Sequence, residues 1–239
     1  MDHEKSIVTP ARFAEGMTFD QYIEYIGTPE NLRREAGWLV GPRRMDFSTI
    51  LRERYARLRL TDEQVEAIRW LAAQPSGPAK VLMISEEWSS DCRRDLPTLG
   101  RLAEAGGLEL RIFPRDGQKV GRDPKANPAD SPNADIVNEF LNVKDGQTYQ
   151  SVPVVAFYTD AFDYIYHYTE FPAIYHKDRV MAAIRAAKPG ETAEETFERG
   201  IRDWRAVQDS PFFRVWACAA VDEMLSVLRE RVVVGSVRR

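Results

Sequence analysis

Residues 80–92 read KVLMISEEWSSDC, and they carry the strongest signals for the fold of this chain. Its first half, residues 80–85, is a short apolar run of the kind that forms a strand buried on both faces. Its second half opens a helix that we predict over about 90–104, where a Gly pair at 106–107 ends it. Open α/β sheets place their chemistry where a buried strand passes into a helix, so residues 86–92 become the candidate site.

Cys92 lies in the first turn of that predicted helix. A helix N-terminus presents free N–H groups and about half a positive charge. Because both stabilise a thiolate, we expect the pKa of Cys92 to lie below that of a free cysteine. Ser89, three residues earlier, is a residue type that commonly caps a helix.

The segments around this stretch alternate between helix and strand. Capping-box pairs open predicted helices at Thr18, Thr61 and Thr192. Further predicted elements are a strand at 108–113, a helix at 134–143, two strands within 152–169, a helix over about 173–187, and a last helix capped by Ser210-Pro211. The helix–strand order favours parallel strands joined by a right-handed crossover. Residues 114–133 hold four prolines and two glycines, and a loop of this length is either functional or disordered.

Composition and charge limit the functions that the chain can have. Its 239 residues are 44% hydrophobic and 29% charged, as in soluble globular proteins. The formal net charge of −4 provides no overall attraction for nucleic acid. No apolar run approaches the roughly 20 residues of a membrane span, and the polar N-terminal stretch lacks the apolar core of a secretory signal. We therefore expect a cytoplasmic protein with neither a nucleic-acid nor a membrane partner.

Cysteine and histidine are scarce, which excludes several kinds of site. The two cysteines, Cys92 and Cys218, lie too far apart in the sequence for a metal-ligand spacing. Three histidines leave little material for a His-rich metal site or a Ser-His-Asp triad. Cys218 lies among alanines on an apolar helix, where a small core residue is expected. We expect no metal and no cofactor.

Several spaced features accompany the motif. They are Glu87-Trp88 ahead of it, Ser89 and Cys92 at its two ends, Pro97 within the helix, Val152-Pro153 at the start of a strand, and the stretch RIFPRDGQ at 111–118. Together they resemble the thioredoxin-like family, in a bacterial branch of poorly defined function. The resemblance implies an α/β thioredoxin fold, which is a central mixed β-sheet flanked by helices, with a cis peptide bond before Pro153 that faces the motif.

The resemblance also implies a domain organisation. It assigns residues 61–187 to a thioredoxin-like domain, with N- and C-terminal helical extensions at 1–60 and 188–239. We expect Phe197, Ile201 and Trp204 to share an apolar stripe on one helix of the C-terminal extension. Such a stripe predicts that this extension packs on the central domain.

The chain departs from the family at the positions that matter most for activity. Ser89 replaces the nucleophilic cysteine, and one helix terminus cannot ionise an alcohol at neutral pH. No histidine lies near Ser89 in the sequence to act as a base. Met83 stands where thioredoxins usually carry a buried aspartate that assists proton transfer. Ordinary dithiol reduction therefore cannot run on this motif.

Three hypotheses remain. In the first, the chain is a thiol-disulfide oxidoreductase in which Cys92 acts as a single thiol on a protein thiol, a protein disulfide or glutathione. Arg93 and Arg94 would then hold an anion or lower the pKa of Cys92, and the alternative is that both arginines are simply solvated. The catalytic candidates are Cys92 and Ser89, and the substrate-binding candidates are Trp88, Ser90, Asp91, Val152 and Pro153.

In the second hypothesis, redox activity has been lost and the chain is a binding module. The groove beside Pro153 would then pair with an extended peptide through strand-like hydrogen bonds, and Ser89 would be only a helix cap. In the third, Ser89 has been engineered from a cysteine, so that the natural motif would be Cys-Ser-Asp-Cys. The sequence leaves all three open.

Overall fold

The computed structural model describes residues 6–37 and 44–234. Four strands form the central sheet in the order β2-β1-β5-β6. These strands are β1 (Lys80–Ser85), β2 (Glu109–Pro114), β5 (Val154–Tyr158) and β6 (Tyr164–Thr169). β1 runs parallel to β2, as the helix–strand order predicted, whereas β5 is antiparallel to both β1 and β6. The predicted central mixed sheet is confirmed.

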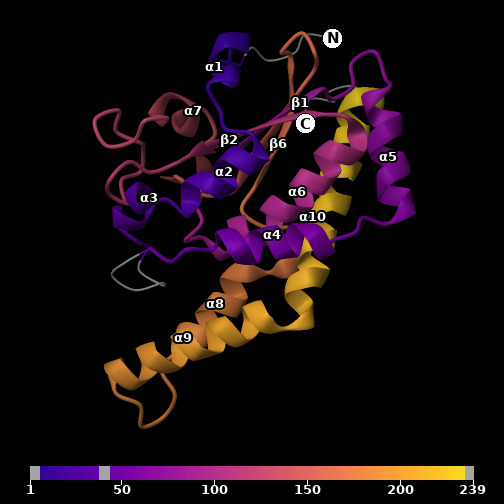
Figure 1. Cartoon of the computed structure of the whole chain (residues 1–239). Coiled ribbons are helices and arrows are strands. Elements are labelled where there is room, and N and C mark those ends of the chain that lie inside the picture. The colour runs from indigo at the N-terminus through magenta and orange to yellow at the C-terminus, as the bar shows by residue number, and fades with distance from the viewer. Residues whose placement is uncertain (1–5, 38–43, 235–239) are drawn as a thin grey trace.

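Helices surround this sheet (Figure 1). They are α1 (Pro10–Ala14), α2 (Phe19–Ile26), α3 (Pro29–Arg33), α4 (Ser48–Arg57), α5 (Asp62–Ala72), α6 (Ser90–Gly106), α7 (Ala134–Glu139), α8 (Lys177–Arg185), α9 (Ala193–Asp209) and α10 (Pro211–Arg229), with a 3₁₀ turn at Ala173–Tyr175 and a π-helical turn at Glu230–Val234. The capping boxes predicted at Thr18, Thr61 and Thr192 are all present.

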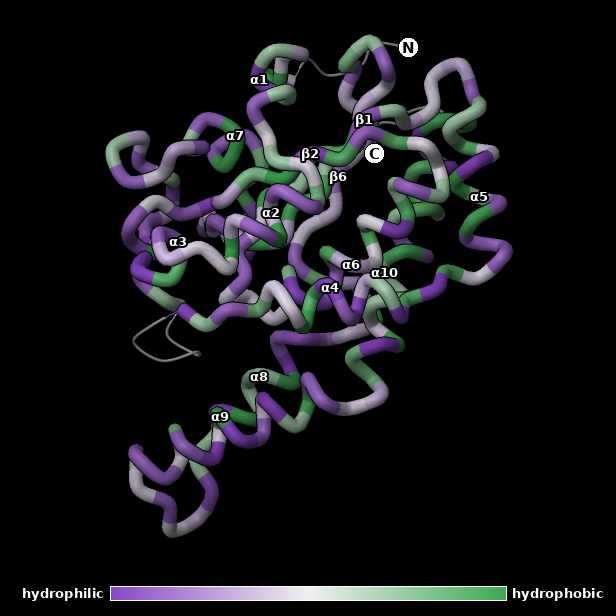
Figure 2. The backbone as a smooth tube through the Cα atoms, in the orientation of Figure 1, coloured by the Kyte–Doolittle hydropathy of each residue, from purple (hydrophilic) through white to green (hydrophobic). Residues whose placement is uncertain are grey.

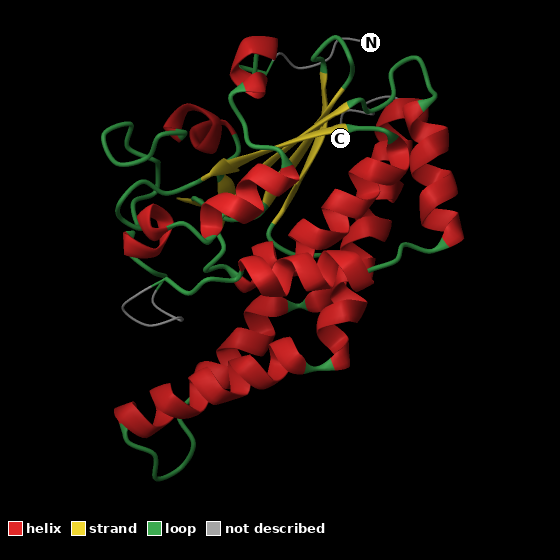
Figure 3. Ribbon diagram, viewed as in Figure 1, coloured by secondary structure: helices red, strands yellow, loops and turns green. Residues whose placement is uncertain are grey.

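Alternate residues of the central strand face opposite layers, as the two-residue period of a strand requires. Val81 and Met83 of β1 join one apolar cluster with side chains from α2, α5, α6 and α10. Leu82 and Ile84 join a second cluster with side chains from α1 and α7. Helices thus cover both faces of the sheet (Figure 3), which is why β1 reads as a continuous apolar run.

Two predicted helices differ in the structure, and a hairpin was missed. The helix expected over about 173–187 becomes a 3₁₀ turn followed by α8, because the chain is interrupted at His176, where φ is 48°. The helix expected at 134–143 ends at Glu139, and the chain then forms β3 (Asn142–Lys144) and β4 (Gln147–Tyr149). Asp145 and Gly146 connect these strands with φ of 50° and 75°. An Asp-Gly pair is a strong signal for such a two-residue turn, because both central residues must adopt positive φ.

The last two helices differ in how they contact the rest of the protein. α10 packs against α5 and α6, whereas α9 contacts α8 and α10. Figure 1 shows α8 and α9 as an arm that projects away from the sheet, and Figure 2 shows its far end to be largely hydrophilic. The apolar stripe predicted for α9 is therefore only partly core, because Trp204 is buried while Phe197 is 51% exposed.

A second correction concerns Ser210. Its side chain was expected to cap α10, but its Oγ donates a hydrogen bond to the Val207 carbonyl of the preceding helix. Pro211 occupies the first turn of α10, where its missing N–H costs nothing. The division at 60 and 187 into a domain with two extensions stays a prediction. None of the helices in the described residues is long and apolar enough to cross a membrane.

Candidate functional site

The candidate site begins at the turn between β1 and α6. Ser89 has extended backbone dihedrals, and its Oγ accepts a hydrogen bond of 3.4 Å from the Cys92 amide. The predicted role of Ser89 as a helix cap is confirmed. Pro97 lies inside α6, and Gly107 ends the helix in the left-handed conformation. The sequence therefore places the start and the end of this helix through local rules.

Cys92 points away from solvent. Its side chain is 1% exposed, and it joins the apolar cluster that includes Ile84 and Phe113. The Glu86 amide donates a hydrogen bond of 3.4 Å to its Sγ. Burial raises the pKa of the Cys92 thiol to about 12. The expected lowering of this pKa is wrong, because one turn into the helix the loss of hydration outweighs the helix N-terminus.

Arg94 is not solvated. Its Nη1 donates to Asp91 at 2.7 Å, and its Nε and Nη2 donate to the two carboxylate oxygens of Asp95, each at 2.7 Å. Asp91 also forms an ion pair with Lys177, the first residue of α8. The two carboxylates neutralise Arg94. The prediction that Arg94 is solvated and the prediction that it holds an anion or lowers the pKa of Cys92 are therefore both wrong.

Arg93 is also buried, so the solvated alternative is wrong for it too. Its Nη1 donates to the Glu87 carbonyl at 2.6 Å, and its Nη2 donates to Gln208 at 2.8 Å. The guanidinium lies 4.2 Å from the centre of the Phe47 ring. Unlike Arg94, it makes no ion pair with a carboxylate among the described residues.

A buried network of ion pairs includes the two glutamates of the turn between β1 and α6. It consists of Arg34, Arg44, Arg115, Glu86, Glu87 and Asp116. Arg44 bridges the two glutamates through its Nη1, at 2.6 Å from Glu86 and 2.8 Å from Glu87. Trp88 donates from its Nε1 to Asp116 at 3.0 Å, so the network also orients the indole ring. Three guanidinium groups thus face three carboxylates in a nearly dry interior, where such charges require partners.

The carboxylates of this network respond differently to their surroundings. Burial alone would raise the pKa of Glu86, but Arg34 and Arg44 bring it below its ordinary value. Burial and repulsion from Glu86 raise the pKa of Glu87. Sequence reasoning missed the network, although Arg115-Asp116 lies within the stretch that carried part of the family resemblance. No local pattern marks Arg34 or Arg44, which reach the turn only through the fold.

The peptide bond between Val152 and Pro153 is cis, as the resemblance implied. The Pro153 carbonyl accepts a hydrogen bond of 2.8 Å from the Glu170 amide, at the start of the β5–β6 pairing. Within residues 6–37 and 44–234, the backbone amide and carbonyl of Val152 have no hydrogen-bond partner. Val152 lines the same hollow as Trp88 and Ser89, so the structure brings these predicted site residues together.

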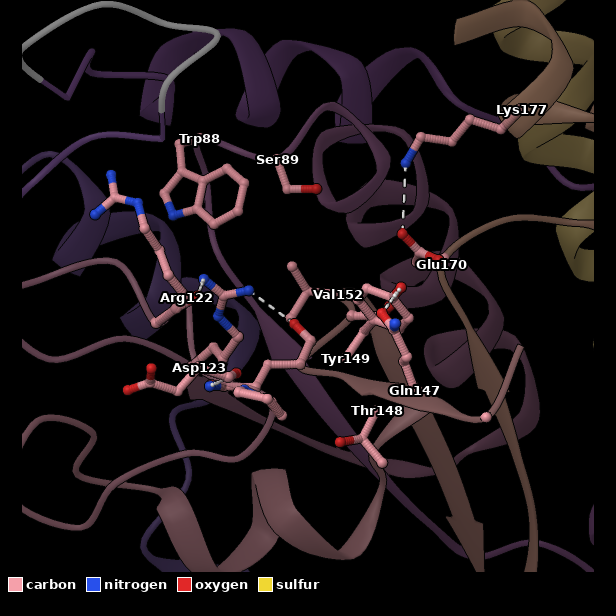
Figure 4. A pocket seen from close by; sticks show the side chains of 16 residues that line it. Trp88, Ser89, Arg122, Asp123, Gln147, Thr148, Tyr149, Val152, Glu170 and Lys177 are labelled. Atoms are coloured by element: carbon pink, nitrogen blue, oxygen red, sulfur yellow. Dashed lines mark hydrogen bonds and ion pairs between the residues drawn. The ribbon is translucent and has the colours of Figure 1, made fainter. Parts of the chain in front are cut away.

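We call this space the hairpin hollow, because the β3–β4 hairpin forms part of its wall. Its volume is about 700 Å³. In Figure 4, Trp88, Ser89 and Val152 surround the hollow, and Lys177 points toward Glu170 at one edge. The opposite wall contains Arg122 and Asp123 from the predicted loop at 114–133 together with Gln147, Thr148 and Tyr149 of the hairpin. That loop is therefore part of the candidate site.

A second space, the arm hollow, lies between the turn and the α8–α9 arm. It has a volume of about 510 Å³ and shares Trp88, Ser89, Glu170 and Lys177 with the hairpin hollow. Its apolar wall consists of Met45, Phe47, Met181, Ile201 and Trp204. The predicted site residues Ser90 and Asp91 also line it. Sequence reasoning missed the arm residues as part of a site, because they come from a segment distant in the sequence.

Pro153 and Cys92 line neither hollow. In the parts of the chain that the structure describes, no group of three or more His, Cys, Asp or Glu side chains could hold a metal ion. The hollows are lined mainly by hydrogen-bonding and aromatic side chains. Such an arrangement can bind a polar chain with occasional apolar side chains. No cysteine of the described residues lines either hollow, and the Lys177 amine, which lines both, is ion-paired with Asp91 and Glu170.

Comparisons with known proteins agree with this fold. Residues 45–124 match the profile of a family described as Thioredoxin. Among solved structures, a protein of unknown function from Pseudomonas aeruginosa is 13% identical with a TM-score of 0.50, over 93% of this chain and 98% of that one. An HIV epitope-scaffold has a TM-score of 0.49 at 15% identity, with the same coverage. At such identities a structural likeness concerns the fold alone. No curated protein matches the chain.

Proposed function

We propose that this thioredoxin-like chain is a redox-inactive binding module that holds an extended peptide across the turn at Trp88 and Ser89. The observation that carries the proposal is the position of Cys92, which is 1% exposed and lines neither hollow. A substrate disulfide in either hollow would meet the Ser89 hydroxyl. An alcohol at that position does not attack a disulfide at neutral pH.

The thiol-disulfide exchange hypothesis requires Cys92 as the attacking thiolate. Its pKa of about 12 keeps it protonated under ordinary conditions, and its burial denies a substrate sulfur the direct approach that exchange needs. Arg93 and Arg94 do not rescue this chemistry, because they bond to Glu87, Gln208 and two aspartates. The structure thus supports the binding-module hypothesis over the single-thiol one.

The backbone of Val152 supports an extended peptide as the ligand. Val152 is only 5% exposed, but it lines the hairpin hollow, and its amide and carbonyl lack hydrogen-bond partners among the described residues. A peptide backbone in that hollow can pair with them, in the way that it pairs with an unpaired strand edge. Two hollows that share Trp88 and Ser89 then extend the binding surface to either side of this point. A peptide could therefore run from the β3–β4 hairpin, past the turn, to the α8–α9 arm.

The walls of the two hollows suggest the composition of that peptide. The hairpin hollow has polar walls, including Gln147, Thr148 and Gln150, which favour hydrogen-bonding side chains. The arm hollow offers Phe47, Met181 and Trp204, which favour a large apolar side chain. We infer a peptide that is polar over the hairpin and apolar over the arm. A cytoplasmic partner protein that presents such a segment is consistent with the location expected from the sequence.

A peptide-display experiment tests this function. Random peptides displayed on phage are selected on the full chain, and the affinity of a selected synthetic peptide is measured by fluorescence anisotropy. Tyr149→Ala in the hairpin hollow and Met45→Asp in the arm hollow should each weaken binding roughly tenfold, the usual scale for losing an interface anchor. Both side chains are substantially exposed, at 44% and 52%, so neither change should unfold the chain.

Val143→Ala is the matched control. Val143 lies on the same hairpin as Tyr149, is 64% exposed and lines neither hollow. Its replacement should leave the affinity unchanged. Failure to select any peptide, or equal affinities for all three variants, would contradict the proposal. Reduction of insulin disulfides by the wild-type chain would instead favour the single-thiol oxidoreductase.

A further inference from the structure

A third hollow, which we call the basic hollow, lies where α4, α6 and the start of α10 meet. Its volume is about 260 Å³. Five arginines line it, namely Arg54, Arg57, Arg93, Arg94 and Arg214. No acidic side chain of the described residues lines it. Apolar contact comes from Leu58, Pro97, Phe213 and Ala217. With these arginine-rich and apolar walls, the basic hollow differs in its lining from the hairpin hollow and the arm hollow.

Most of these arginines lack a compensating carboxylate. Arg94 is neutralised by Asp91 and Asp95, and Arg57 lies 3.8 Å from Glu53. Arg54, Arg93 and Arg214 form no ion pair with any residue that the structure describes. One carboxylate, that of Asp209, lies near enough for its charge to act against the lowering of the pKa of Arg54. Asp209 and Arg54 nevertheless form no ion pair.

Arg93 carries the strongest signal. It is 7% exposed, and its two hydrogen bonds go to the neutral Glu87 carbonyl and the neutral Gln208 amide. A guanidinium has five N–H donors, so several remain available. Arg54 approaches it closely enough to donate to the Arg93 carbonyl at 3.4 Å. Arg93 is buried and Arg54 is half-buried, and two cations placed together in this way without an anion are unfavourable unless something neutralises them.

The pKa values of Arg93 and Arg54 are both lowered, as expected for two neighbouring cations without an anion. Burial, followed by repulsion from Arg54, lowers the pKa of Arg93 to about 10. Burial also lowers the pKa of Arg54. Both groups stay cationic at neutral pH, and an anion between them would restore their ordinary values.

We propose that the basic hollow binds an organic phosphate, with its phosphate group among Arg54, Arg93 and Arg214 and its apolar part against Pro97 and Phe213. Three unpaired guanidinium groups exceed the charge of one carboxylate but suit a phosphate dianion, which several arginines can bind through forked hydrogen bonds. The volume accepts a phosphate with a ring-sized apolar group. The basic hollow shares no lining residue with the hairpin hollow, and it shares only Arg93 and Gln208 with the arm hollow.

Isothermal titration calorimetry with phenyl phosphate as the probe tests the proposal on the full chain. We expect binding that weakens as salt is added. Arg54→Gln and Arg214→Gln should each reduce the affinity roughly tenfold, the usual cost of losing one charged hydrogen-bond partner. Arg214 is exposed and has no partner among the described residues, so its replacement cannot unfold the chain through a lost contact.

Arg52→Gln is the matched control, because Arg52 belongs to α4 but does not line the basic hollow. It should bind phenyl phosphate like the wild type. Inorganic phosphate, which lacks the ring, and benzoate, which replaces the phosphate by a carboxylate, should both bind more weakly. The proposal is overturned if phenyl phosphate does not bind, if Arg214→Gln binds it as well as the control does, or if either comparison anion binds as tightly.

Discussion

Ser89 and Cys92 belong to one helical turn, yet the fold gives them opposite surroundings. Ser89 lines both the hairpin hollow and the arm hollow. Cys92 lines neither and belongs to the apolar cluster that includes side chains of α1 and α7. The residue that a ligand would meet is therefore the one without a thiol. At the scale of single residues, this reversal favours the proposed binding module over a redox enzyme.

The two cysteines should differ in reactivity. In the native chain, Cys218, which is partly exposed, should react with iodoacetamide at pH 8, while the buried Cys92 should react only on unfolding. The reason is that alkylation needs an accessible thiolate, and the pKa of Cys92 is about 12. Mass spectrometry after timed labelling measures both sites in one sample, with Cys218 as the internal control. Equal labelling rates for the two cysteines would refute the buried position.

The same pKa predicts a dependence of stability on pH. The folded chain holds the Cys92 proton up to about pH 12, whereas the unfolded chain releases it near the ordinary value of 9. The stabilisation from this group is therefore complete below pH 9 and is lost as pH rises from 9 to 12, by about 4 kcal/mol over that window. Burial also raises the pKa of tyrosines such as Tyr158 and Tyr166, which add to the loss of stability at alkaline pH. The measurement is therefore the difference in urea unfolding between the wild type and Cys92→Ala. A constant difference across these pH values would contradict the prediction.

At the scale of elements, the buried charge network joins segments that the sequence keeps apart. Arg34, at the end of α3, donates to Glu86 at 2.9 Å and to the Asp116 carbonyl at 2.5 Å. Glu86 belongs to the turn before α6, and Asp116 opens the loop after β2. The network thus holds the candidate site against both the N-terminal helices and the long loop. Helix caps define where α6 starts, but the network defines what lies around that start.

Breaking this network should be costly. Arg34→Met removes one partner of a buried carboxylate and should lower the free energy of unfolding by about 3–5 kcal/mol. Arg33→Met, at the neighbouring exposed position, should change it by less than about 0.5 kcal/mol. Urea unfolding monitored by circular dichroism measures both values. Similar stabilities for the two variants would show that the network does not stabilise the turn.

At the scale of the whole molecule, the last two helices have different roles. α10 completes one face of the core, where Val221 and Met224 are buried against the other helices. α9 belongs to the arm, and its inner side chains line the arm hollow. α10 therefore contributes to stability, and α9 contributes to the arm hollow of the proposed peptide-binding surface.

Two substitutions separate these roles. Met224→Ala should lower the free energy of unfolding by about 2–5 kcal/mol, because it opens a cavity in the core. Phe197→Ala, at a position that is 51% exposed on α9, should change it by less than about 0.5 kcal/mol. Thermal or urea unfolding gives both values. If Phe197→Ala proves as costly as Met224→Ala, α9 packs on the core as the sequence had suggested.

Much of the fold and the position of the candidate site can be predicted from the amino-acid sequence. The strand at 80–85, the capping residues of α2, α5, α6 and α9, and the motif between Trp88 and Cys92 depend on neighbours within a few positions. Local signals of this kind are present in any window of the chain, because capping, turn formation and strand periodicity are short-range effects.

The ionisation and the surroundings of the site residues, in contrast, depend on contacts between distant parts of the chain. Whether Arg94 is solvated, whether Cys92 ionises, and which side chains border the turn depend on residues far away in the sequence, such as Lys177 beside Asp91 and Arg44 beside Glu86. Hydration is lost or kept according to what packs on a group, and electrostatic energies in a dry interior far exceed those in water. The pKa of a buried thiol is therefore a property of the packed molecule, and the local sequence around Cys92 pointed in the wrong direction.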